Sequence, residues 1–326
     1  MNEKIKLLAV TGATASGKSA LALELCRRLD GELVSCDSMQ IYRGMDVGTA
    51  KPTNAEKCEI PHHMIDVCDP CDNYSASDYA EAAKKVIADI HSRGKLPILC
   101  GGTGLYLDAL LRPKAFSDSD SDGCARIREE LWHFVETNGN AALHEMLMNI
   151  DPASAEAIHP NNVKRVMRAI EIYRTTGVTK SESDKASVVG ESPYDCTVIT
   201  LDWESRETLY RRIDRRVDEM MASGLEREVR ELFTSGALPE DSTAAQAIGY
   251  KEMLSYLRGE GTLIDAVETI KKNTRNYAKR QVTWFRRYDG IRLAADSGGR
   301  VKTARELADE VTEKIDTCKI KKDMLK

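Results

Sequence analysis

Over the first third of the chain, short apolar runs alternate with longer amphipathic segments. The runs at 6–13, 31–38 and 95–104 each pass into small or polar residues, the pattern of buried strands that end in turns. The segments 18–29 and 75–94 carry apolar residues at helical spacing, and the second has a serine cap and a terminal glycine. Because strands and helices alternate, the pattern predicts an α/β fold with a parallel sheet and helices on both faces.

The pattern changes in the middle of the chain. Between 116 and 190 the apolar residues recur only at helical spacing, with interruptions by Gly, Asn and Pro. The run at 195–203 returns to the pattern of a buried strand, several helices follow, and a short strand at 290–295 precedes a last helix. We therefore expect a core made of 1–115 and 191–326, interrupted by a helical insertion domain at 116–190.

The composition is that of an ordinary globular protein. Of the 326 residues, 42% are apolar and 30% are charged, and no apolar run reaches the roughly 18 residues that a membrane helix needs. The N-terminus enters the first strand without a signal-peptide pattern, so we expect a cytoplasmic protein with no membrane partner. The net charge of −5 does not indicate nucleic-acid binding, yet residues 271–288 contain seven basic residues and no acidic one.

The nine cysteines are scattered, and an odd number argues against a complete disulfide framework. The densest group lies in PHHMIDVCDPC, where His62, His63, Cys68 and Cys71 could in principle bind zinc. Their spacing matches neither common zinc-finger pattern, so free thiols are the preferred interpretation. Metal binding by Cys68 and Cys71 stays an open alternative.

A phosphate-binding loop follows the first predicted strand. Residues 12–19 have the spacing G-x-x-x-x-G-K-S between a strand and a helix, so the core is expected to resemble that of P-loop NTPases. Backbone amides of such a loop surround a phosphate group, while Lys18 supplies a charge and Ser19 a hydroxyl ligand for Mg²⁺. The predicted phosphate-binding residues are Gly12, Ala13, Thr14, Ala15, Ser16, Gly17, Lys18 and Ser19.

Most such loops bind a nucleoside triphosphate, and their usual partner is a strand that ends in a magnesium-binding Asp. The run LPILCGGTG ends in glycines and Thr103 instead. Asp37 and Asp202 do end apolar runs, but only Asp37 belongs to an early strand that we expect beside the loop. Asp37 could bind magnesium, act as a base or cap a turn, and Thr103 could face the phosphate site or form a tight turn.

Basic residues recur at helical spacing in two further places. Arg212 and Arg216 lie four residues apart on a predicted helix, where they could clamp a phosphate or pair with neighbouring acids. Lys164, Arg165 and Arg168 begin a helix within the insertion. Together with the basic and aromatic residues of 271–288, they could contact phosphates and stack on unpaired bases, although the apolar members of both segments could equally form core.

In combination these motifs resemble one family, the tRNA dimethylallyltransferases, also called tRNA isopentenyltransferases or IPP transferases. The matching motifs occur in the family's order: GATASGKSALA, SCDSMQIYRGMDVGTAKPT, PHHMIDV, YSASDY, LCGGTGLYLDALL, HPNNVKRVMRAIE, RRIDRRVDEMMASGL, AIGYKEM and YAKRQVTWFRR. They extend from about Leu8 to Arg287. Ala13 replaces the proline common in the family's loop, and the C-terminal zinc finger of eukaryotic members is absent, so the resemblance is to the bacterial form.

The resemblance implies a prenyl transfer rather than nucleotide chemistry. The loop and Arg216 would hold the diphosphate of dimethylallyl diphosphate, with Mg²⁺ bound through Ser19. The acceptor would be the N6 amine of the adenosine 3′-adjacent to the anticodon in tRNA, and the product N6-(dimethylallyl)adenosine. Asp37 matches the family's general base, and Thr103 matches a residue that assists at the diphosphate or the acceptor.

The resemblance also implies a tRNA surface. The tRNA anticodon stem-loop would be the partner, with the insertion domain clasping the stem, and we expect the protein to act as a monomer. The residues that match tRNA-contacting positions are Asp37, Ser38, Met39, Gln40, Lys164, Arg165, Val166, Met167, Arg168, Lys279, Arg280 and Gln281.

Three other functions share some of these motifs. A P-loop small-molecule kinase would use the loop and consume ATP, but it gives no role to the basic, aromatic segments. An AMP-directed adenylate isopentenyltransferase would share the core without needing the tRNA-binding insertion. An RNA-binding protein gated by a nucleotide would need the loop and the basic segments but neither Asp37 nor Thr103.

Overall fold

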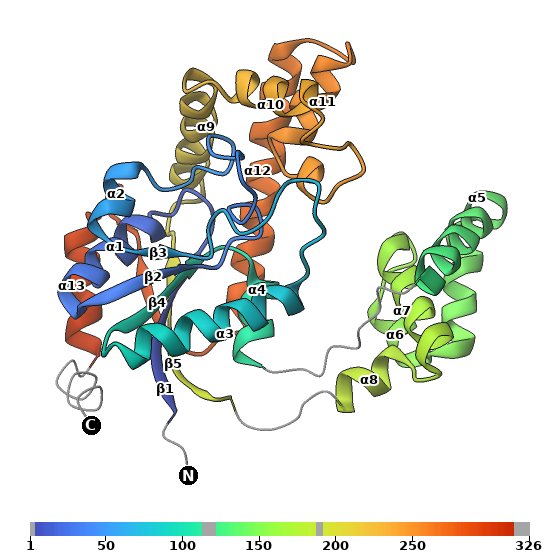
Figure 1. Cartoon of the computed structure of the whole chain (residues 1–326), viewed down its shortest axis with the longest axis horizontal. Coiled ribbons are helices and arrows are strands. Elements are labelled where there is room, and N and C mark those ends of the chain that lie inside the picture. The colour runs from blue at the N-terminus through green and yellow to red at the C-terminus, as the bar shows by residue number, and fades with distance from the viewer. Residues whose placement is uncertain (1–3, 113–121, 187–191, 316–326) are drawn as a thin grey trace. The chain divides into compact units, whose positions relative to one another are not determined.

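A parallel sheet forms the centre of the larger part of the molecule (Figure 1). The computed structural model describes residues 4–112, 122–186 and 192–315. Within these residues the sheet has six strands in the order β3-β2-β4-β1-β5-β6, and all neighbouring strands run parallel. The strands are β1 (Ile5–Gly12), β2 (Gly31–Ser35), β3 (His62–His63), β4 (Leu96–Gly101), β5 (Tyr194–Asp202) and β6 (Ile291–Ala294). The predicted α/β fold is confirmed.

Helices cover both faces of this sheet because its strands are apolar on both sides. Alternate residues of β1 belong to two separate cores: Leu7 and Ala9 to one, Leu8 and Val10 to the other. The first core includes buried side chains of α3 (Ala76–Ser92), α4 (Gly104–Leu111) and α12 (Leu263–Phe285), and the second those of α1 (Lys18–Leu29) and α13 (Ala304–Lys314).

Further helices pack beyond the carboxyl ends of the strands and carry several site residues. They are α2 (Asn54–Glu59), α9 (Arg206–Ala222), α10 (Leu225–Thr234), the short 3₁₀ helix η1 (Ala244–Gln246) and α11 (Tyr250–Leu257). A small antiparallel pair, β7 (Asp296–Ser297) and β8 (Arg300–Val301), follows β6. No helix in the described ranges is long and apolar enough to cross a membrane.

The chain divides into two compact units. One comprises Met1–Leu111 with Pro193–Lys326, and the other Arg112–Ser192. The boundaries expected at 115/116 and 190/191 lie outside the described residues. The second unit contains α5 (Asp122–Ile150), α6 (Pro152–Ala157), α7 (Val163–Thr176) and α8 (Lys180–Ala186), and α5 is two helices joined at a kink at Gly139.

Candidate active site

The phosphate-binding loop joins β1 to α1 with a backbone that favours glycine at two positions. Gly12 has a φ of 148° and Gly17 a φ of 96°, which side-chain-bearing residues rarely adopt. Ala15 also has a positive φ, 59°, and Lys18 Nζ donates a hydrogen bond to the carbonyl oxygen of Ala13 at 3.3 Å. Because α1 begins at Lys18, the unpaired N–H groups of its first turn lie at the loop, and their positive dipole end favours an anion there.

The loop is held in place by a buried side chain from the far end of the sequence. The N–H of Thr14 donates to Oε1 of Gln281 at 2.8 Å, and Nε2 of Gln281 donates to the carbonyl of Gly102 at 2.9 Å. Gln281 is 4% exposed, so its amide joins the phosphate loop to the glycine turn after β4. Both ends of its amide are used inside the protein, so the geometry favours a supporting role, and the expected contact of Gln281 with tRNA stays a prediction.

The carboxylate of Asp37 lies just beyond β2. Its Oδ1 accepts a hydrogen bond from the N–H of Met39 at 2.9 Å, which fixes the carboxylate in a turn. The hydroxyl of Thr103 accepts from the N–H of Ser38 at 3.0 Å and donates to the Ser38 hydroxyl at 3.2 Å. These contacts make Thr103 a support for the Asp37 turn, and its expected role at the diphosphate or the acceptor stays a prediction.

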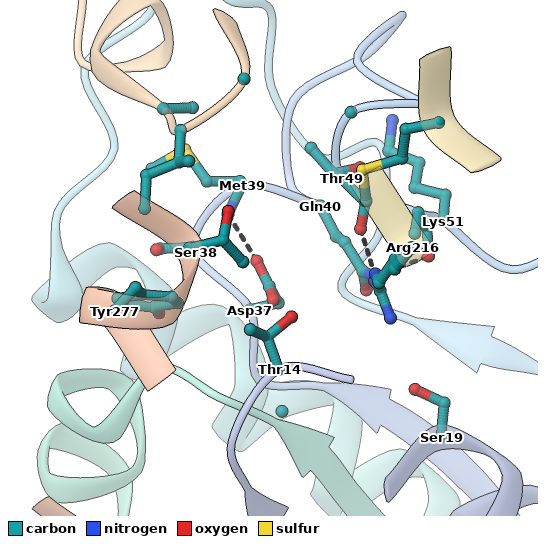
Figure 2. Close-up of a pocket in the computed structure, with 18 of the residues that line it drawn as sticks. Thr14, Ser19, Asp37, Ser38, Met39, Gln40, Thr49, Lys51, Arg216 and Tyr277 are labelled. Carbon is teal, nitrogen blue, oxygen red and sulfur yellow. Dashed lines mark hydrogen bonds between the residues drawn. The ribbon is translucent and has the colours of Figure 1, made fainter. Parts of the chain in front are cut away.

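The phosphate-binding loop and the turn at Asp37 both border one cavity of about 480 Å³. Figure 2 shows Ser19, Gln40, Thr49, Lys51 and Arg216 on one side of this view, and Ser38, Met39 and Tyr277 on the other, with Asp37 and Thr14 between them. Of the residues predicted from the sequence, the cavity wall brings together Thr14, Lys18, Ser19, Asp37, Ser38, Met39, Gln40, Arg216, Arg280 and Gln281.

The cavity presents two buried cations, Lys18 and Arg216, that are not ion-paired with any described carboxylate. Burial lowers the pKa of Lys18, and burial also lowers the pKa of Arg216, although the charge of Asp37 opposes the second shift. The Nε atom of Arg216 is buried and has no hydrogen-bond partner among the described residues. Since a desolvated cation is costly unless it meets an anion, this end of the cavity is built to bind one.

Arg212 and Arg216, the two arginines of α9 singled out in the sequence, have different positions. Arg212 Nε donates to the carbonyl of Ala15 at 3.0 Å, and its guanidinium lies 5.3 Å from the ring centre of Trp203. Arg212 therefore supports the outside of the phosphate loop, while Arg216, one turn later, lines the cavity. Asp202, the other acid considered at a strand end, pairs with Arg292 at 2.8 Å and is not among the residues of the cavity wall.

Several cavity residues carried no predicted role. Tyr277 lines the cavity, and burial raises its pKa to about 12, so its hydroxyl stays protonated. Lys51 is a second unassigned residue: its Nζ donates to the Tyr42 carbonyl at 2.6 Å and to Asp46 at 2.8 Å. Both residues belong to quoted motifs, YAKRQVTWFRR and GTAKP, but nothing in the local sequence says which members face the cavity.

The zinc alternative at PHHMIDVCDPC finds no support in the geometry. The ring of His62 bonds to the carbonyl of Ile60 at 2.7 Å, and that of His63 to the carboxylate of Glu32 at 2.7 Å. Cys68 and Cys71 are both free thiols. In the described part of the chain, no three His, Cys, Asp or Glu side chains are arranged to hold a metal ion.

Basic side chains of α12 are available at the cavity. Lys279 and Arg280 are exposed, and Arg280 also lines the cavity. The Arg280 guanidinium lies 5.6 Å from the ring centre of Tyr277, and Lys279 Nζ lies 5.9 Å from that of Tyr210. These contacts leave the cationic groups at the surface, where an RNA backbone could reach them.

The predicted tRNA contacts of the second unit separate into two groups. Lys164 and Arg165 are exposed at the start of α7, and Arg168 Nη1 bonds to the buried carboxylate of Glu171. Val166 and Met167 are 0% and 4% exposed in the core of this unit. Their predicted contact with tRNA is wrong because their side chains face the interior of the helical bundle.

Over most of its length the chain matches one family. The family model described as IPP transferase matches residues 40–288. The chain belongs to the IPP transferase family. A protein of Caldanaerobacter subterraneus named tRNA dimethylallyltransferase is 46% identical over 311 residues, which cover 95% of this chain and 97% of the relative. The resemblance seen in the sequence motifs is confirmed.

Solved structures of similar proteins have the same fold. A tRNA delta(2)-isopentenylpyrophosphate transferase from Staphylococcus epidermidis matches with a TM-score of 0.69 and 43% identity, covering 96% of this chain and 99% of that one. A eukaryotic dimethylallyltransferase acting on tRNA matches with a TM-score of 0.75 and 30% identity, covering 90% of this chain and 74% of that one. The parallel core around the phosphate loop is therefore the family's fold.

Proposed function

We propose that this protein transfers a dimethylallyl group from dimethylallyl diphosphate to the N6 amine of the adenosine 3′-adjacent to the anticodon in tRNA, giving N6-(dimethylallyl)adenosine. The observation that carries the proposal is the single cavity in which a phosphate loop, two buried cations and Asp37 meet. The names of the Caldanaerobacter relative and of the eukaryotic structure support the same reaction.

The anion-binding end of the cavity holds the diphosphate. The loop amides, Lys18 and Arg216 surround it, and each gains interaction energy as the bond between C1 of the donor and the diphosphate oxygen breaks, because negative charge grows on the leaving group. Binding of the anion also reverses the burial effects that lower the pKa of Lys18 and Arg216. The site thus stabilises the departing diphosphate more than the intact donor.

Asp37 takes the proton at the acceptor. The N6 amine of adenine is a weak nucleophile, and it becomes acidic as its nitrogen bonds to C1 of the dimethylallyl group. Asp37 accepts one N6 proton as that bond forms, while the electron pair of the breaking C–O bond leaves with the diphosphate. The hydrogen bond from the Met39 N–H holds the carboxylate in position for this step.

The residues present fit a bound Mg²⁺ ion. Ser19 places its hydroxyl on the cavity wall in the first turn of α1. The Ser/Thr hydroxyl at this position of a P-loop is a known Mg²⁺ ligand, and the ion keeps waters and substrate phosphate oxygens as its other ligands, so Ser19 would hold it from the protein side. When bound, the ion would neutralise charge on the diphosphate.

tRNA binds through the exposed cations. Lys279 and Arg280 contact the backbone next to the cavity, and Lys164 and Arg165 contact it from the second unit. Arg168 is half-buried and bonds to Glu171, so it supports this surface. The target adenosine leaves the anticodon stack to reach Asp37, which costs a few kcal/mol and less in a single-stranded loop. The contacts to phosphates provide the energy for this step.

The proposal is tested by incubating the protein with Mg²⁺, unmodified tRNA and radiolabelled dimethylallyl diphosphate, with AMP as a parallel acceptor. Label in tRNA alone is the expected result. Label in AMP would instead indicate the adenylate enzyme, and ATP consumption without label transfer would indicate a kinase.

The role of Asp37 is tested by Asp37→Asn, with Asp202→Asn, at the end of β5 in the same sheet, as the matched control. Loss of the base should reduce kcat by about 100-fold or more and leave tRNA affinity unchanged. The control should retain wild-type turnover, because the carboxylate of Asp202 pairs with Arg292 outside the cavity. Unchanged turnover in Asp37→Asn would remove Asp37 from the mechanism.

A further inference from the structure

One wall of the cavity consists of a segment with no helix or strand, residues 46–52, here called the donor-side loop. Residues 48–52 line the cavity. Ala50, Lys51 and Pro52 also line a neighbouring groove together with Arg216 and Ala15 of the phosphate loop. Figure 2 places Thr49 and Lys51 on the Arg216 side of the cavity. The donor-side loop therefore encloses the end of the cavity where the diphosphate binds.

A carboxylate outside the cavity holds this loop. Glu228 of α10 accepts hydrogen bonds from three consecutive backbone N–H groups, those of Asp46 at 2.9 Å, Val47 at 2.7 Å and Gly48 at 3.1 Å. The Tyr250 hydroxyl donates to the same carboxylate at 2.6 Å. Three convergent N–H groups are an anion-binding arrangement, and here the anion is a side chain of the protein itself.

The contact between this loop and α11 is also close. A Cβ at Gly48 would lie 2.5 Å from the ring of Tyr250, so only glycine allows the loop to approach the hydroxyl that bonds to Glu228. On the inner side, Nε2 of Gln40 donates to the carbonyls of Thr49 and Ala50, both at 3.3 Å. The loop is thus fixed from the inside by Gln40 and from the outside by Glu228.

We propose that Glu228 is a positioning residue for the donor: by fixing the donor-side loop beside Arg216, it sets the KM for dimethylallyl diphosphate without touching it. Glu228 is not among the residues that line the cavity or the groove, so it acts through the backbone that it holds in place and not by contact with the donor. This inference rests on the proposed transferase function.

The test compares Glu228→Ala and Glu228→Gln with Glu226→Ala. Glu226 lies on the same helix, and its carboxylate pairs with Arg230 rather than with the loop. In Glu228→Ala the KM for dimethylallyl diphosphate should rise about tenfold, equivalent to about 1.4 kcal/mol. The kcat at saturating donor and the Kd for tRNA should stay within about twofold, because the acceptor side of the cavity is unchanged.

Glu228→Gln keeps one carbonyl oxygen for the loop N–H groups, so its KM should lie between those of the wild type and Glu228→Ala. Glu226→Ala should match the wild type. Hydrogen exchange gives a readout independent of activity: the amides of Asp46, Val47 and Gly48 should lose protection in Glu228→Ala, while those of the sheet keep theirs.

Two results would overturn the inference. Retained protection of these amides would show that Glu228 does not hold the loop. Lost protection with an unchanged KM for the donor would show that the loop's position does not matter for donor binding. Failure of the transferase proposal is distinguishable, because the wild-type protein would then transfer no label to tRNA.

Discussion

Replacing Gln281 with Met tests whether this side chain supports the phosphate loop or contacts tRNA. Met has a similar length and volume, so the substitution leaves no large cavity. It removes the acceptor for the Thr14 N–H and the donor to the Gly102 carbonyl, both in a site where Gln281 is only 4% exposed. A buried group left without a partner costs about 1–3 kcal/mol; the Thr14 N–H loses its acceptor, whereas the Gly102 carbonyl keeps the Tyr277 hydroxyl at 3.5 Å, so the free energy of unfolding should fall by about 1–3 kcal/mol.

Thermal denaturation followed by circular dichroism measures this loss. For a unit of this size each kcal/mol shifts Tm by about 2–4 °C, so a central loss of about 2 kcal/mol predicts a fall of about 4–8 °C. The KM for dimethylallyl diphosphate should also rise, because the loop amides near Thr14 are no longer fixed. Affinity for tRNA at constant salt should not change.

Arg280→Met provides the matched control on the same helix. Arg280 is exposed, so its replacement should leave Tm within about 1 °C and weaken tRNA binding instead. If Gln281→Met behaved like this control, with normal stability and weaker tRNA binding, the internal role assigned to Gln281 would be refuted.

Two further predictions concern pH and salt. Hydrogen bonds from Arg93 lower the pKa of Glu32 to about 2 from the usual glutamate value of 4.5, so the stability contributed by the folded-state carboxylate is present above about pH 4.5 and is lost as the pH falls toward 2. Acid denaturation should therefore be less steep in Glu32→Gln below about pH 4.5, and identical slopes would contradict the assignment. In the second unit, Lys164→Ala should reduce the slope of log K for tRNA against log salt by about 0.7–0.9, whereas Lys180→Ala, whose ammonium pairs with Asp184, should not. An unchanged slope in Lys164→Ala would remove that lysine from the RNA contacts.

The parallel core could be predicted because its strands are buried on both faces and end in turns. The apolar runs before Gly12 and around Leu33 stand out against the amphipathic helices that separate them. The two-residue strand His62–His63 has too few residues to show any period, and it forms only because its backbone pairs with β2. Its existence follows from tertiary contacts rather than from local sequence.

The residues that contact tRNA were harder to predict from the sequence than the helices and strands. In α7 the helical spacing of Val166, Met167, Ala169 and Ile170 marks an apolar face, and that pattern indicates core despite the basic residues between them. Gln281 carries no such signal, because a glutamine in a basic helix has the same local pattern whether it faces RNA or the protein. Its partner Thr14 lies 267 residues away in the sequence, so only the folded chain shows the pairing.

The glycine turn after β4 and the C-terminal helix α12 are matched to each other in spacing. A Cβ at Gly102 would lie 2.1 Å from Gln281 Nε2, and a Cβ at Gly104 would lie 2.1 Å from the Trp284 ring. Two residues along the turn thus correspond to about one helical turn along α12, so glycine at both positions lets the helix approach closely enough to reach the phosphate loop. The glycines that replace the usual strand-terminal Asp therefore serve to bring Gln281 to the phosphate loop, and with it the helix that carries Tyr277 and Arg280 into the cavity wall.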